Sequence, residues 1–198
     1  MANLHIYVYD RFKINTEQKI SSKDLFLAAL KDYCSTKNIH IDIDKIKIQK
    51  GEKGKPFVEN LDICFNISHS SNYWVCAFSP YPVGIDIQTY SSKKTDKIAA
   101  RYFTKNEQDY LLKSGDLTEN NSKEKAFYKI WTIKEAYAKY FGESIFNVIN
   151  TIETVKDNKI LDNIDGINLY DINLQNIGCT VASKDDKTIC IKKLNFAL

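Results

Sequence analysis

The spacing of apolar positions in the first 88 residues predicts strands grouped around one helix. Residues 4–9 (LHIYVY) are rich in β-branched and aromatic side chains, and residues 41–48 (IDIDKIKI) alternate apolar with polar, so both are expected to be strands. Between them, apolar residues at helical spacing follow two serines and predict a helix over 22–37. Three more strands are expected, separated by turn-forming Ser, Asn and Pro, at 64–68, 73–78 and 83–87.

After Gln88 the pattern becomes helical and then returns to strands. Thr104, with Glu107 three residues later, makes a capping box for a helix that runs to Leu112. A polar stretch, 114–124, precedes an amphipathic helix with six aromatic residues over 127–142 (FYKIWTIKEAYAKYFG). The remaining apolar runs are short and strand-like, with Asp-Asn and Asp-Asp pairs at turns between several of them.

This order predicts an α+β fold made of two halves of similar size. The break falls near Tyr81-Pro82, which gives residues 1–82 and 83–198 as the two units. The halves share no sequence period, so the pattern does not indicate a repeat.

Composition narrows the class of protein without naming a ligand. The 198 residues are 43% hydrophobic and 27% charged, which suits a core with a charged surface. A formal charge of +3 permits an acidic partner but does not demand nucleic acid. No apolar run approaches the ~20 residues of a membrane span, and the first residues lack the pattern of a signal peptide, so a cytoplasmic protein is expected, with no membrane partner.

The five cysteines are odd in number and widely spaced. No CxxC pair occurs, and most of them lie in apolar runs, which favours free buried thiols in a reducing compartment. With three histidines at unsuitable spacing, a zinc site is not expected.

Three short segments carry candidate chemistry, and each also has an ordinary structural interpretation. The loop Gly51–Pro56 (GEKGKP) could bring two lysines to phosphate, or be a plain turn. The strand end at 65–71 (FNISHSS) could address a ligand, or begin a turn. We exclude a serine hydrolase there, because the segment lacks a G-x-S-x-G elbow and an evident acid for His69.

The third segment, 83–88 (VGIDIQ), places Asp86 and Gln88 on the same side of a strand by alternation. Two oxygen-bearing side chains on one face can hold a hard cation such as Mg²⁺, or simply make the polar face of an edge strand. On the aromatic helix, Glu135 and Lys139 lie one turn apart beside Lys134. Such a pair is usually a solvated surface contact worth roughly 0.3–0.5 kcal/mol.

Taken in order, five motifs resemble the phosphopantetheinyl transferases of the surfactin-synthetase-activating type. The resemblance covers roughly residues 50–145 and rests on GEKGKP, FNISHS, PVGIDIQ, RYFTKNE and FYKIWTIKEAYAKYFG. It implies two α+β halves related by a pseudo-twofold axis, with coenzyme A in the cleft between them. It also implies transfer of 4′-phosphopantetheine from coenzyme A to a serine of an apo carrier protein, releasing adenosine 3′,5′-bisphosphate.

Carried over residue by residue, the resemblance implies roles for eleven positions. Asp86, Gln88 and Glu135 would be Mg²⁺ ligands, and Glu135 would be the candidate base, oriented by Lys139, which would also stabilise charge on the phosphate. Lys134 and Lys139 would lie along the diphosphate and pantetheine. The nucleotide side of coenzyme A would be held by Gly54, Lys55, Pro56, Asn66, Ser68 and His69. Base and metal-ligand roles for Glu135 partly conflict, and the sequence leaves the balance open.

The chain departs from the family pattern in three places. Gln88 stands where a third acid is common, and Gly142–Ile145 (GESI) replaces the usual Gly-x-Gly-Leu. The amino-terminal region is short and lacks the basic stretch that larger relatives use on the nucleotide 3′-phosphate. These departures motivate a second hypothesis, a coenzyme A-binding or carrier-docking protein without catalysis.

The resemblance also implies an acidic carrier protein as partner, for fatty-acid, polyketide or peptide synthesis, and favours a monomer acting in secondary metabolism. A basic surface beside the cleft would steer such a carrier. The candidates, which could equally form an ordinary solvated face, are Lys93, Lys94, Lys97, Arg101 and Lys105, followed by the 114–124 loop. A nucleic-acid binder is disfavoured by the modest charge.

Overall fold

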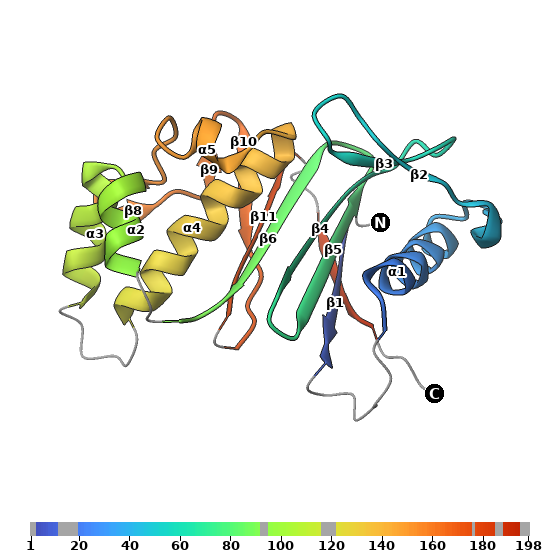
Figure 1. Ribbon diagram of the computed structural model, residues 1–198, viewed down its shortest axis with the longest axis horizontal. Coiled ribbons are helices and arrows are strands. Elements are labelled where there is room, and N and C mark those ends of the chain that lie inside the picture. The colour runs from blue at the N-terminus through green and yellow to red at the C-terminus, as the bar shows by residue number, and fades with distance from the viewer. Residues whose placement is uncertain are drawn as a thin grey trace.

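Two four-stranded sheets, each covered by a helix, make up most of the protein (Figure 1). This computed structural model describes residues 3–11, 20–91, 95–115, 122–175, 177–184 and 188–194. Helices and strands both contribute heavily, so the predicted α+β class is confirmed.

The first sheet has the strand order β12-β1-β5-β4. Its central strand β1 (Leu4–Asp10) is antiparallel to β5 (Tyr73–Ser79), which forms a hairpin with β4 (Cys64–Ser70). On the other side, β12 (Ile189–Lys193) runs parallel to β1. The sequence prediction placed this last strand in the second half, which is wrong: the chain returns to the first sheet.

Helix α1 (Ser22–Thr36) covers the outer face of this sheet. Ser21 caps it in a reciprocal capping box with Asp24, as the serine-rich start of the segment indicated. Its buried stripe packs on aromatic residues of the sheet, including Phe65 and Phe78.

The second sheet has the order β6-β11-β10-β9. All its named pairs are antiparallel: β6 (Val83–Thr89) with β11 (Ile177–Ser183), β11 with β10 (Ile167–Asp171), and β10 with β9 (Asn163–Ile164). The long helix α4 (Ser122–Phe141) lies diagonally across β6 and β11 (Figure 1). It begins five residues earlier than the sequence predicted.

Gly84 makes the close approach of α4 to β6 possible. A Cβ atom at this position would lie 2.0 Å from the backbone oxygen of Ala136, so any side chain would push the helix away. The strand then presents Asp86 and Gln88 to the helix, because both share the face of Gly84.

The opposite faces of the two sheets meet in an apolar layer. Alternate residues of β1 and β5 pack there against alternate residues of β6 and β11, among them Ile6, Val75, Ile85, Ile87 and Val181. This layer fixes the two sheets against each other and explains the short apolar strands that the sequence predicted.

The remaining elements are short. Helices α2 (Thr95–Tyr102) and α3 (Lys105–Gly115) pack beside α4, and Thr104 with Glu107 forms the predicted capping box of α3. Two small hairpins, β2 (Ile48–Lys50) with β3 (Pro56–Val58) and β7 (Val155–Lys156) with β8 (Lys159–Ile160), complete the fold with the short helix α5 (Ile145–Val148).

The strand predicted over 41–48 is wrong. Residues Ile43–Lys45 form a single 3-10 turn, capped by the side chain of Asp42, and only Ile48 belongs to a strand. The Asp42 side chain accepts a hydrogen bond from the Asp44 backbone N–H, which favours a turn over a ladder. Among the described helices, none is both long and apolar enough to cross a membrane.

Candidate active site

Asp86 is the centre of a polar cluster where α4 crosses β6. This residue is 1% exposed, yet it carries two close polar partners on Oδ1: Lys139 Nζ at 2.6 Å and Ser68 Oγ at 2.8 Å. The Gln88 amide donates from Nε2 to Asp86 Oδ2 at 3.4 Å. A buried carboxylate needs such partners, because burial without them costs several kcal/mol, so this cluster has a physical reason to be well ordered.

Glu135 lies next to this cluster and enters it differently. Burial and the nearby charge of Asp86 raise the pKa of the Glu135 carboxyl, while Lys139 acts in the opposite direction. Within the described residues, no hydrogen bond or ion pair reaches the Glu135 carboxylate. The structure therefore brings a second, unpaired carboxylate beside a paired one, and the site can accept either a proton or a cation there.

Ser68 reaches the cluster from the first sheet. Its hydroxyl donates to Asp86, and it accepts hydrogen bonds from Lys139 Nζ at 3.1 Å and from the Ile87 backbone N–H at 3.4 Å. The sequence placed Ser68 near the nucleotide phosphates but gave no sign of its contact with Asp86. The detectable signal was the alternation of Asn66, Ser68 and Ser70, which puts three polar side chains on one face of β4.

The other two candidate site residues of this segment, Asn66 and His69, make no hydrogen bond to Asp86. Asn66 is 8% exposed, and its Oδ1 accepts from the Ile85 backbone N–H at 2.9 Å. His69 is exposed and, by alternation, lies on the face that Phe65 and Ile67 share, opposite Ser68. The structure thus separates Ser68 and His69, which the sequence treated as a pair.

Lys55 joins the GEKGKP loop to both elements of the site. Its Nζ donates to the backbone oxygens of Val83 and Tyr140, at 3.0 Å each, so it caps a carbonyl at the end of α4 and another at the start of β6. Burial lowers the pKa of this lysine. Gly54 takes a positive φ of 79° in the loop, which ends at Pro56, the first residue of β3.

The same loop also contacts the segment after α4. Lys53 forms an ion pair with Glu143, and Gly142, at a φ of 68°, lies against the Lys55 side chain. The GEKGKP loop therefore lies at the end of the site from which α4 leaves. It contacts Gly142 and Glu143, the first two residues of the GESI segment in which the chain departs from the family pattern.

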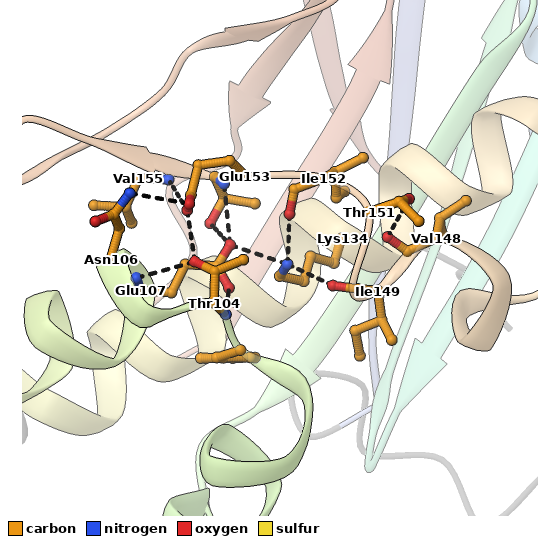
Figure 2. Close-up of polar contacts among 12 residues, drawn as sticks. Thr104, Asn106, Glu107, Lys134, Val148, Ile149, Thr151, Ile152, Glu153 and Val155 are labelled. Carbon is orange, nitrogen blue, oxygen red and sulfur yellow. Dashed lines mark hydrogen bonds and ion pairs between the residues drawn. The ribbon is translucent and has the colours of Figure 1, made fainter.

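Lys134 does not belong to the Asp86 cluster, in contrast to the sequence expectation. Its side chain is fully buried and donates to Ile149 O at 2.7 Å, Ile152 O at 2.9 Å and Glu107 Oε1 at 3.0 Å (Figure 2). An ammonium group has three hydrogens, and all three are used inside the protein. Burial lowers the pKa of Lys134, and the paired Glu107 acts against that shift. We therefore leave Lys134 out of the proposed ligand site.

Glu107 completes that internal network. Its Oε1 also accepts from Thr154 N at 3.0 Å and Thr154 Oγ1 at 2.7 Å, and its Oε2 accepts from Thr104 N at 2.9 Å. The capping-box acid of α3 thus also holds α4 and the 149–154 segment together, which the sequence motif alone did not reveal.

The basic surface expected beside the site is described only in part. Lys93, Lys94 and residues 116–121 lie outside the described residues. Lys97 and Arg101 are exposed on α2, and Lys105 is exposed but paired with Asp109 at 2.7 Å.

The donor set at the cluster fits a hard cation. In the part of the chain that the structure describes, no group of three His, Cys, Asp or Glu side chains converges on one point. Asp86 and Glu135 nevertheless supply two neighbouring carboxylates, and a 180° turn of the Gln88 amide would put its oxygen toward Asp86. Oxygen ligands of this kind, with water completing the shell, are what Mg²⁺ prefers.

Comparison with known proteins gives a consistent result. A family model described as the 4′-phosphopantetheinyl transferase superfamily matches residues 82–189, more than half of the chain. The chain is similar to the 4′-phosphopantetheinyl transferase gsp of Aneurinibacillus migulanus, with 42% identity over 113 residues, 57% of this chain and 45% of that protein.

Two further relatives agree. The chain is 33% identical over 111 residues to the 4′-phosphopantetheinyl transferase Sfp of Bacillus subtilis (strain 168), covering 56% of this chain and 47% of Sfp. It is 31% identical over 112 residues to the 4′-phosphopantetheinyl transferase HetI of Nostoc sp. (strain PCC 7120 / SAG 25.82 / UTEX 2576), covering 53% and 45%. The chain thus matches about half the length of these curated relatives.

Proposed function

The chain belongs to the 4′-phosphopantetheinyl transferase superfamily, and we propose that it transfers the 4′-phosphopantetheine group of coenzyme A to a serine of an apo carrier protein. The products are the holo-carrier protein and adenosine 3′,5′-bisphosphate. The observation that carries this proposal is the cluster of Asp86, Glu135 and Lys139, where a buried carboxylate, an unpaired carboxylate and an amino group meet.

The reaction breaks the phosphoanhydride bond of coenzyme A and forms a phosphodiester with the carrier serine. The carrier serine hydroxyl attacks the phosphorus that bears the pantetheine, and the bond from that phosphorus to the oxygen bridging it to the adenosine phosphate breaks. The serine proton must be accepted as the new P–O bond forms, and the departing adenosine bisphosphate carries away the electron pair. Catalysis of such a step depends mostly on positioning and on neutralising charge.

Glu135 is the proposed acceptor of the serine proton. Its carboxylate has no partner among the described residues, and its raised pKa makes it a better base than an exposed glutamate. Lys139, which is 28% exposed at its side chain, holds Asp86 and offers positive charge to the phosphate oxygens. The two roles are compatible because Lys139 and Glu135 lie one turn apart on α4.

Mg²⁺ is the proposed cofactor, held by Asp86 and Glu135 with Gln88 as an amide ligand. When bound, it would neutralise negative charge on the diphosphate. The chain's own part is to keep Asp86 and Glu135 close despite their repulsion, and Lys139 contributes to this by pairing with Asp86 at 2.6 Å. Bound cation would also compete with the proton that Glu135 is meant to accept.

Coenzyme A is proposed to lie between the two halves, which we take to be related by a pseudo-twofold axis. Two four-stranded sheets, with the Asp86 cluster where β4 and β6 approach, support this arrangement. The nucleotide would extend toward the GEKGKP loop, where Gly54, Lys55 and Pro56 lie. We also assign His69, which is exposed on β4, to the nucleotide subsite. Lys55 and Asn66 already hold backbone groups, so we assign them a supporting part in that subsite.

The proposed partner is an acidic carrier protein, and the exposed Lys97 and Arg101 on α2 support a docking face for it. We further propose a monomer acting in the cytoplasm. The five cysteines are all free thiols, which suits a reducing compartment.

The direct test is to incubate the protein with coenzyme A, Mg²⁺ and a panel of acyl, polyketide and peptidyl apo carriers. Mass spectrometry should detect the phosphopantetheine increment on at least one carrier. Absence of the increment across the panel would reject transfer. If calorimetry then still detected binding of coenzyme A, the protein would be a binding protein without catalysis.

A further inference from the structure

The free edge of β6 is bound by side chains instead of a strand. On one side, β6 pairs with β11 along its whole length, whereas no described strand forms a backbone ladder with its other edge. There, side chains of β4 accept hydrogen bonds from alternate backbone N–H groups. Asn66 Oδ1 accepts from Ile85 at 2.9 Å, Ser68 Oγ from Ile87 at 3.4 Å and Ser70 Oγ from Thr89 at 3.0 Å.

These three contacts have one register, since each joins residues 19 positions apart. Strand alternation explains the regularity, because every second residue of β4 faces β6 and every second N–H of β6 faces β4. We call this set of contacts the side-chain seam. It satisfies the edge of β6 and joins the first sheet to the second without a continuous ladder.

Only the middle residue of the seam also contacts the proposed active site. Ser68 is 6% exposed, donates to Asp86 Oδ1 at 2.8 Å and accepts from Lys139 Nζ at 3.1 Å. Ser70, two residues along, makes a seam contact of the same kind and bonds Thr89 Oγ1 at 3.1 Å. The two serines are therefore matched in their seam contacts, but only Ser68 also contacts Asp86.

We propose that Ser68 is a positioning residue that couples the first sheet to Asp86 and Lys139. A serine hydroxyl has one hydrogen and two lone pairs, and at Ser68 all three are used, by Asp86, Lys139 and the Ile87 N–H. Its position on β4 fixes the direction of the Asp86 carboxylate on the other half. This inference rests on the proposed function, which it deepens.

This role differs from direct binding of the nucleotide. A serine that held a coenzyme A phosphate would act mainly on the KM for coenzyme A. A serine that orients Asp86 acts on kcat and on the Mg²⁺ requirement, because Asp86 would serve the reacting diphosphate. The split between KM and kcat therefore separates the two roles.

The experiment compares Ser68→Ala, Ser68→Thr and Ser70→Ala. Both alanine variants lose one seam contact, so a lower thermal midpoint is expected for each, with the larger decrease in Ser68→Ala because the buried Asp86 also loses a partner. Transfer should fall about 10- to 100-fold in kcat for Ser68→Ala only, as is typical when a group that orients a metal ligand is removed. The KM for coenzyme A should stay within about threefold of wild type, and Ser68→Thr, which keeps the hydroxyl, should recover most of the lost kcat.

Two results would overturn the inference: an equal loss of kcat in Ser68→Ala and Ser70→Ala, or a loss confined to the KM for coenzyme A. If wild-type protein modifies no carrier, the proposed function fails, and the inference is then decided on geometry. Crystal structures of the two alanine variants should differ, with the Asp86 carboxylate turned away from its wild-type direction only in Ser68→Ala. An unchanged Asp86 in that variant would reject the positioning role.

Discussion

Two lysines of helix α4 each pair with a carboxylate of another element. The two pairs differ in how completely their polar atoms are hydrogen-bonded inside the protein. In the pair of Lys134 with Glu107, both side chains are 0% exposed and every lysine hydrogen has an acceptor. In the pair of Lys139 with Asp86, the lysine side chain is 28% exposed and an unpaired carboxylate, Glu135, lies beside it. We call Lys134 with Glu107 the closed pair, because it has no capacity left for a ligand. We call Lys139 with Asp86 the open pair, because it can still bind one.

The difference follows from helix geometry rather than from residue type. Lys134 and Lys139 are five positions apart, which corresponds to about 140° around a helix of 3.6 residues per turn, whereas Glu135 and Lys139 differ by only about 40°. One face of α4 therefore meets β6 and the other meets α3 and the 149–154 segment. The comparison shows that a lysine in a functional motif can be a structural residue.

The largest effect is expected from removing either carboxylate at the open pair, Asp86 itself or the neighbouring Glu135. Asp86→Ala and Glu135→Ala should each lower the rate of carrier modification by about 10³- to 10⁴-fold, because charge neutralisation and proton acceptance are lost. Circular dichroism spectra should remain those of the wild type, since removing Glu135 takes no apolar contact from the core. Rates are measured by mass spectrometry of the carrier at saturating coenzyme A and Mg²⁺. Near-normal turnover in either variant would disprove the site assignment.

The closed pair should give the next largest effect, and on stability rather than on chemistry. Lys134→Ala leaves the Glu107 carboxylate buried without its cation, which typically costs about 3–5 kcal/mol of the free energy of unfolding. Urea denaturation of wild type and variant measures this loss. The double variant Lys134→Met/Glu107→Gln, which removes both charges and keeps the volume, is the control and should lose less than Lys134→Ala. If Lys134→Ala were as stable as wild type while losing coenzyme A binding, the lysine would be a ligand after all.

The sequence predicted the local pattern well where one face of an element is apolar. The strands around residues 64–89 and the capping box of α3 were predictable because periodicity and cap chemistry are local. The 41–48 strand was wrong because the side chain of Asp42 caps a turn there, and β12 was misplaced because pairing between residues as distant as Leu4 and Ile189 leaves no local signal. Asp86, Glu135 and Lys139 were grouped through the order of the motifs. The structural role of Lys134 could not be predicted, because it depends on contacts with Glu107 and with backbone carbonyls of another segment.

The pH dependence of stability should report on the unpaired Glu135 beside the open pair. Burial and Asp86 raise the pKa of Glu135 above its unfolded value, so the folded protein binds a proton at this carboxyl more tightly than the unfolded chain does. The resulting contribution to stability is fully present below pH ~4.3 and is lost as the pH rises through the folded pKa. In metal-free protein, Glu135→Gln should therefore be more stable than wild type at pH 7, and this advantage should vanish near pH 4. Thermal unfolding across this range measures the difference. Added Mg²⁺ should stabilise wild type more than the variant, and an equal response would argue against Glu135 as a ligand.

The smallest effect is expected at Gln88, which tests whether position 88 contributes a cation ligand to the Asp86 cluster. Its amide donates to Asp86 Oδ2 at 3.4 Å, so Gln88→Glu replaces a weak donor with a third carboxylate near Asp86 and Glu135. Without metal, the added repulsion should lower the thermal midpoint slightly, because like charges at close range disfavour one another. At saturating Mg²⁺ the added ligand should offset this, leaving kcat within about threefold of wild type or raising it. The matched variant Gln88→Ala loses the amide and should need more Mg²⁺ for half-maximal rate. A Mg²⁺ titration of wild type, Gln88→Glu and Gln88→Ala therefore ranks them by the Mg²⁺ concentration that gives half-maximal rate. If the titrations coincided, position 88 would not face the cation, and the open site would consist of Asp86 and Glu135 alone.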